Sequence, residues 1–117
     1  MTDNLHFLTD VDGEVQALYE FCRSKGDFAM ADLSRIPAHM LAPLARYVVF
    51  GIKGGSFLTS LMSNDLQGAV KSADADNLHH LRDWCILVYN TLPIGCSGSR
   101  QKVKDWTEQG GLMGTKS

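Results

Sequence analysis

The sequence predicts an all-α fold: a single compact domain of five or six helices around a central buried helix at about residues 75–90. Three observations lead to this prediction. Apolar residues recur at intervals of three and four along most of the chain, which is the period of an amphipathic helix. Helix-capping residues and glycines separate these stretches. Finally, the strongest apolar run has no partner strand elsewhere in the sequence.

Chain length favours one domain over residues 1–117. A chain of this size buries roughly two-thirds of its unfolded surface, so it needs no metal or disulfide to hold it together. The two ends lack a clear apolar period, and we expect residues 1–9 and 111–117 to be loose. Asp10 or Asp12 can cap a first helix that ends at Lys25, directly before Gly26.

Two prolines shape the next segments. Asp27 can cap a short helix, and Pro37 suits the first position of a further helix that extends to about residue 50. Pro43 removes an amide donor inside that pattern. Either the helix is kinked at Pro43, or regular helix begins near Ala42 after an irregular turn.

The stretch from residue 51 to 74 contains two helix-start signals. Ser56 follows three glycines as an expected N-cap, and Asn64 begins a second short helix with Asp65 in its first turn. The expected inner face of the first helix consists of Phe57, Leu58, Leu61 and Met62. That of the second consists of Leu66, Ala69, Val70 and Ala73.

The C-terminal part contains the longest predicted helix and a last short one. Asp74 caps the helix at 75–90, and the run at 84–89 is apolar all round. Such a run could also be a buried strand, but its continuity with the helical period upstream and the lack of a partner strand favour a buried helix. The expected inner face consists of Leu78, Leu81, Cys85 and Val88. After a glycine-rich loop, Ser99 caps a helix that ends at Gly110 and Gly111.

Charge, cysteine content and hydropathy argue against a general nucleic-acid binder, a disulfide-stabilised secreted protein and a membrane protein. The net charge of −2 and pI near 6.0 argue against a general nucleic-acid binder, which would carry a basic excess. Three cysteines without a C-x-x-C pair indicate a reducing compartment. No apolar run reaches the roughly 18–20 residues of a membrane span, and the N-terminal sequence does not resemble a signal peptide. We therefore expect a cytoplasmic protein without a membrane partner, and we leave a homo-oligomer open.

Two glycine-rich turns are the candidate ligand-binding elements. The first contains Lys53, Gly54, Gly55 and Ser56. The second contains Cys96, Ser97, Gly98, Ser99, Arg100 and Lys102. Backbone amides at a helix start, with cations beside them, suit an anionic ligand if the turns meet in space. The first turn is no Walker A loop, because its lysine precedes glycine and no strand precedes it. The alternative is that both turns are structural, a C-cap glycine and a tight connection between helices.

Other chemistry-bearing residues have structural interpretations. His79 and His80 point about 100° apart on a helix and cannot both coordinate one metal ion, so we expect no metal site. Asp76 and His80 lie on one helix face, where we expect a surface ion pair or a hydrogen-bonded core histidine. Cys22 and Cys85 are expected in the core, and Trp84 and Trp106 pack it as well. Cys96 is the thiol placed to react, although no histidine is locally positioned as its base. We expect no enzyme and no cofactor, with a hydrolase that uses Cys96 as a third hypothesis.

One ordered pattern of residues runs from residue 36 to 106. It comprises Gly51, Gly55-Ser56-Phe57-Leu58, Asn64-Asp65-Leu66, Ala69, Ala73-Asp74, Tyr89-Asn90, Pro93, Gly95-Cys96, Gly98-Ser99, Val103 and Trp106. This arrangement resembles a family of short uncharacterised proteins encoded by bacteriophages and prophages. The chain departs from the family at Lys53-Gly54, where prolines are expected, and in its additional N-terminal helix. The resemblance implies a small accessory protein in the host cytoplasm that binds a host protein or sequesters a host signal.

Two functional hypotheses follow from these observations. The leading one is a non-enzymatic phage-type accessory protein that binds a host protein, such as a defence component. The alternative is a module that binds or sequesters a nucleotide or other phosphorylated compound between the two glycine-rich turns, with Lys53 and Arg100 supplying charge-assisted contacts.

Overall fold

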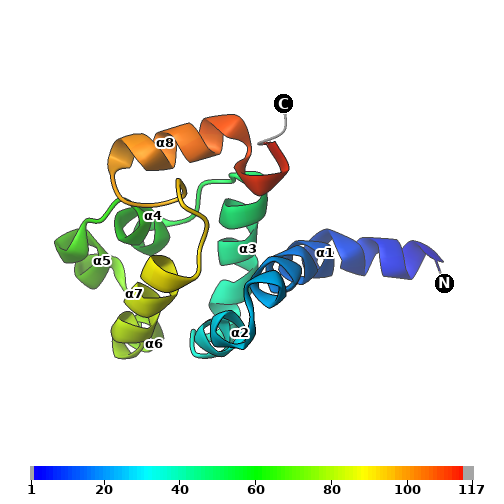
Figure 1. The fold of residues 1–117 in the computed structure, drawn as a ribbon, viewed down its shortest axis with the longest axis horizontal. Helices are drawn as coiled ribbons and strands as arrows, with labels where there is room; N and C mark the ends of the chain where they lie inside the picture. Colours follow the sequence, from blue (N-terminus) through cyan, green and yellow to red (C-terminus); the bar gives the residue numbers. More distant parts are fainter. Residues whose placement is uncertain (1, 115–117) are drawn as a thin grey trace.

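Helices account for all of the regular structure in the described part of the chain. The computed structural model describes residues 2–114, with side chains from residue 13 onward. Within that range it contains eight α-helices, two short 3-10 helices and no strand, which confirms the all-α prediction (Figure 1). The elements are α1 (Thr2–Lys25), α2 (Asp27–Ser34), η1 (Ala38–Met40), α3 (Leu41–Phe50), α4 (Ser56–Met62), α5 (Leu66–Ser72), α6 (Ala75–His79), α7 (Leu81–Asn90), α8 (Arg100–Gln109) and η2 (Gly111–Gly114).

Helix α3 occupies the middle of the fold (Figure 1). Helix α1 packs along α3 and extends beyond the rest of the molecule, while α4 and α5 pack on each other on the opposite side (Figure 1). Helix α8 lies across one end and contacts α4, and η2 closes against α3. Helix α2 contacts α7, where Thr91 Oγ1 donates a hydrogen bond of 2.9 Å to the buried Asp32 Oδ2. One continuous core therefore joins the two sides.

The predicted central helix at 75–90 is replaced by two helices. The chain breaks at His80, where φ is −103° and ψ is 20°, so α6 and α7 are separate. Helix α3 has five buried residues, namely Leu44, Ala45, Tyr47, Val48 and Val49, whereas α7 has two. Helix α3 therefore has a larger buried share than α7, because neighbours cover it on several sides.

The predicted inner face of that segment is correct for Leu81 and Val88, which are partly buried against the core, and wrong for Leu78 and Cys85. Leu78 is 48% exposed and Cys85 is exposed, while Asn77, Trp84 and Leu87 point inward. Trp84 Nε1 donates to Asn77 Oδ1 at 3.0 Å across the break. Burying the large Trp84 indole, whose N–H has a hydrogen-bond partner, stabilises the fold more than burying the smaller side chains of Leu78 and Cys85 would. The face of α6 and α7 that carries Asn77, Trp84 and Leu87 therefore points to the core.

The N-terminal helix begins earlier than its sequence signals suggest. Helix α1 starts at Thr2, so residues 2–9 are helical rather than a loose arm, and Asp10 and Asp12 lie within the helix. It ends as predicted at Lys25, with Gly26 at φ 114°. Gly26 also takes the N-cap position of α2 that we assigned to Asp27, which is the first helical residue.

Pro43 lies in the first turn of its helix. Regular helix begins at Leu41, after η1, so Pro43 is the third residue of α3. Amides in the first turn have no partner within the helix, and proline there removes no hydrogen bond. The second of the two alternatives, a start near Ala42 after an irregular turn, is therefore correct.

N-cap positions agree with the sequence at two helices and, as at α2, are shifted by one residue at α4 and α5. Asp74 accepts from Asn77 N, and Ser99 accepts from Lys102 N at 3.1 Å, as predicted. At α5 the cap is Asp65 rather than Asn64, and at α4 it is Gly55 rather than Ser56. The α5 face is rotated too: Ala69 is buried, but Leu66 and Val70 are exposed.

Residues 111–114 form η2, which packs against α3. Helix α8 ends at Gly110, whose φ is 87°, and the buried Gly111 begins η2, so 111–114 are packed rather than loose. Residues 115–117 lie outside the described part. Taken over the described residues, no helix combines the length and the apolar character that crossing a membrane requires.

Candidate functional site

The first glycine-rich turn meets one residue of the second. A pocket of about 380 Å³ is lined by Lys53, Gly54, Gly55 and Ser56, by Thr59 and Ser60 of α4, and by Arg100 of α8. Lys53 and Arg100 are both exposed, so two cations and several hydroxyl groups border this pocket. Arg100 Nη2 also donates to Asp65 Oδ2 at 2.9 Å, which offsets part of its charge.

The rest of the second turn is used elsewhere. Ser97, Gly98 and Lys102 line a different cavity, and Ser99 caps α8 with its hydroxyl. Cys96 is fully buried. The two predicted turns therefore form no single site; the structure brings together the first turn and Arg100 alone.

The prediction that Cys96 is the reactive thiol was wrong. Its side chain is fully buried, and burial raises its pKa to about 12, so the nucleophilic thiolate is scarce at neutral pH. Cys22 is buried as predicted, and burial raises its pKa to about 11. Cys85, which we expected in the core, is the exposed thiol of the chain's three cysteines.

Two of the histidines with described side chains, His39 and His80, pair with acids. His80 Nδ1 lies 3.0 Å from Asp83 Oδ2, so its partner is not the predicted Asp76. His39 Nε2 lies 3.0 Å from Asp74 Oδ2 at the surface. The Asn77 backbone N–H and then the His39 ring hold the pKa of Asp74 below its usual value. Across residues 13–114, no three His, Cys, Asp or Glu side chains gather closely enough to hold a metal ion.

A larger cavity lies between α5, α7, the loop at 93–98 and the start of α8. Its volume is about 600 Å³, and we call it the apolar groove. Its lining includes Leu66, Cys85, Tyr89, Ile94, Gly98 and Lys102. Three large apolar side chains project there into solvent: Leu66 is 61% exposed, Tyr89 90% and Ile94 94%. Such a concentration of exposed apolar side chains is characteristic of an interaction surface.

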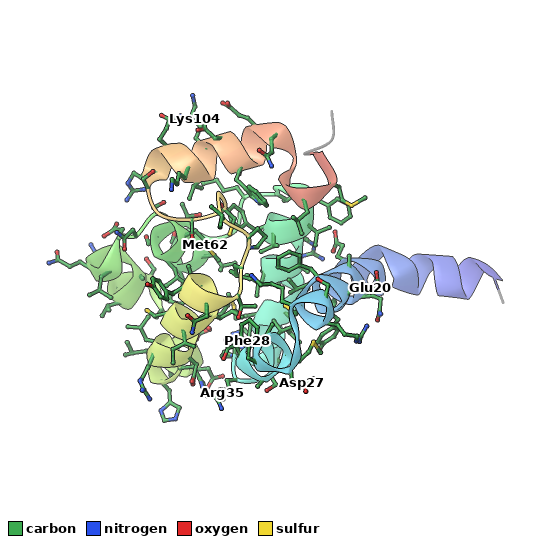
Figure 2. The ribbon with its side chains drawn as sticks, viewed as in Figure 1. Glu20, Asp27, Phe28, Arg35, Met62 and Lys104 are labelled. Carbon is green, nitrogen blue, oxygen red and sulfur yellow. The ribbon has the colours of Figure 1, made fainter. Side chains whose placement is uncertain are left out.

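Hydrogen bonds fix the loop that carries Ile94. Gly98 N donates to Met62 O at 2.8 Å, which ties the loop to α4, and the buried Met62 lies inside the body (Figure 2). Tyr47 Oη donates to Cys96 O at 2.6 Å, and Cys96 N donates to Pro93 O. Gly95 has φ 105°, a backbone conformation that side chains disfavour. The exposure of Ile94 is therefore built into a loop held by the core.

Sequence reasoning missed this groove. It placed Leu66 on an inner face and Tyr89 in a run buried all round, because both continue an apolar pattern. The available signal was the width of that pattern: α7 carries more apolar residues than one buried face accommodates.

Comparison with known proteins gave no relative: no family model, no curated protein and no solved structure matches this chain.

Proposed function

We propose that this chain is a non-enzymatic binding protein that holds a partner protein in the apolar groove. The observation that carries the proposal is the exposure of Tyr89 and Ile94, each at least nine-tenths accessible. Covering large apolar side chains with a partner removes them from water, which lowers the free energy. Tyrosine also concentrates binding energy at protein interfaces. Because the loop at 93–98 is held in place, binding requires little ordering of this surface.

The resemblance to phage and prophage proteins supports a host protein as the partner, and a defence component is the class we favour. Several positions that carry the resemblance also line the groove, namely Asn64, Asp65, Leu66, Tyr89, Gly95 and Gly98. The part of the chain that motivates the resemblance and the part that motivates binding therefore overlap. On this proposal the protein acts in the host cytoplasm.

A pull-down with matched variants tests the groove. Tyr89→Ser combined with Ile94→Ser removes the two most exposed apolar groups, and we expect at least about a 10-fold loss of captured host protein. The free energy of unfolding should change by no more than about 0.5 kcal/mol, because both side chains are at the surface. Phe28→Ser is the control: Phe28 is 51% exposed on α2 and does not line the groove (Figure 2). Equal capture by wild type and the double variant would contradict the proposal.

A second candidate function is favoured by the 380 Å³ pocket. It brings Lys53 and the glycine turn together with Arg100, as a phosphorylated small ligand would require. If such a ligand binds, a nucleotide at a hundred times its dissociation constant should stabilise the fold by about 2.7 kcal/mol. A thermal-shift screen with nucleotides and cyclic nucleotides measures this, and Lys53→Ala with Arg100→Ala should abolish the shift. A flat response to every compound would remove this candidate.

A further inference from the structure

We propose that the groove binds a peptide segment in which a large apolar side chain is accompanied by a carboxylate, and that Lys102 pairs with this carboxylate. This inference rests on the proposed function and names the chemistry of the partner. We infer the carboxylate because one charged side chain at the groove has a partner within the protein and the other has none.

Two charged side chains line the groove, Asp65 and Lys102. Both oxygens of the Asp65 carboxylate already have a partner: Oδ1 accepts from Gly68 N at 3.0 Å, and Oδ2 accepts from Arg100 Nη2 at 2.9 Å, which balances its charge. Lys102 makes no ion pair with any residue between 13 and 114. The groove therefore presents one uncompensated positive charge.

The fold holds Lys102 beside the apolar part of the groove. Its backbone amide donates to Ser99 Oγ at 3.1 Å, which fixes it in the first turn of α8. Its side chain passes close to Gly98, where an added Cβ would lie 3.2 Å from Lys102 Cδ. Gly98 and Ile94 belong to the same fixed loop, so the cation and the exposed apolar groups form one surface.

The apolar groups favour a polypeptide over a small enclosed ligand. Tyr89 and Ile94 are at least nine-tenths exposed, so they stand out from the surface rather than line an interior. Side chains in that position contact a partner that extends across the groove. Complementary charge at such a surface selects the partner, and here it selects a carboxylate.

Selection from a random peptide display library tests this inference, with four immobilised forms of the full chain. These are the wild type, Lys102→Glu, Lys104→Glu and the double variant Tyr89→Ser with Ile94→Ser. Lys104 is the matched control because it lies on the same helix, pairs with Glu108 at 3.4 Å, projects from the outer face of α8 (Figure 2) and does not line the groove. We expect wild type and Lys104→Glu to enrich peptides with a large apolar residue near Asp or Glu. Lys102→Glu should enrich Lys or Arg instead.

The affinity of one enriched peptide for each variant measures how much Lys102 contributes to binding. Lys102→Glu should weaken it by about 10-fold or more, and Lys104→Glu by less than about 3-fold. Bound peptide should also slow alkylation of Cys85, because this exposed thiol lines the groove. All the replaced side chains are exposed, and an unchanged melting temperature verifies folding.

Failures of the two proposals are distinguishable. Apolar peptides without an acidic preference, or a preference that Lys102→Glu leaves intact, would overturn the role of Lys102 and leave groove binding standing. Peptides that bind the double variant equally well, or that leave Cys85 unprotected, would overturn both proposals, as would the absence of any enriched peptide. A dimer by light scattering that the double variant dissociates would identify a second copy as the occupant and overturn the inference.

Discussion

Replacing Trp84 with alanine is expected to lower the free energy of unfolding by about 3–5 kcal/mol. Trp84 is among the largest fully buried side chains, and its ring meets Phe57 edge to face with centroids 5.5 Å apart. Truncation leaves a cavity among α4, α6 and α7 and also leaves the buried Asn77 without the N–H that its Oδ1 accepts. Urea unfolding followed by circular dichroism measures the loss.

Trp84→Phe separates the two contributions. Phenylalanine keeps most of the buried ring but cannot donate to Asn77, so we expect an intermediate loss of about 1–3 kcal/mol. If Trp84→Ala lowers the free energy of unfolding no more than Trp84→Phe does, the packing of the buried ring does not contribute the stability that we assign to it.

Replacing Gly51 with alanine should cost about 2–5 kcal/mol, from a left-handed backbone and an overpacked contact together. Gly51 ends α3 with φ 71°. An added Cβ would lie 2.7 Å from Gly111 N and 2.8 Å from Trp106 O, both backbone atoms that cannot swing aside. The substitution should therefore push η2 away from α3. Chemical denaturation measures the loss of stability.

Gly55→Ala is the control for this prediction. Gly55 has φ −74°, and no atom within 4 Å would meet the new Cβ. We expect it to cost at most about 1 kcal/mol, since it changes only the preference at an N-cap. Similar losses for the two variants would show that the approach of η2 to α3 does not limit stability.

Local signals in the sequence predicted the helical class and several boundaries correctly. Asp74 and Ser99 cap the helices that the sequence assigned to them, and Gly26 ends the first helix. Caps and helix ends depend on interactions between residues a few positions apart, so they can be predicted from the local sequence. The start of α1 was missed because a cap can begin a helix but cannot prevent one from starting earlier.

Candidate site residues were predicted less well. Lys53 and Arg100 meet at one pocket, but Cys96 is buried and Lys102 belongs to the apolar groove. The chemistry of a loop is visible in its residue types, whereas its burial depends on what packs over it. Cys96 is covered from outside its own segment, and the bond from Tyr47 to its carbonyl joins residues 49 positions apart.

By itself, the sequence determined that this chain folds as helices, where most of them end, and that Asp74 and Ser99 cap two of them. Those outcomes follow from backbone and side-chain energies within one or two turns. Tertiary structure alone decided which helix faces are buried, that Tyr89 and Ile94 stand in solvent, and that Lys102 lies beside them. The physical reason is that an apolar pattern wider than one face can be buried in several rotations, and only competition among all the helices for the core selects one.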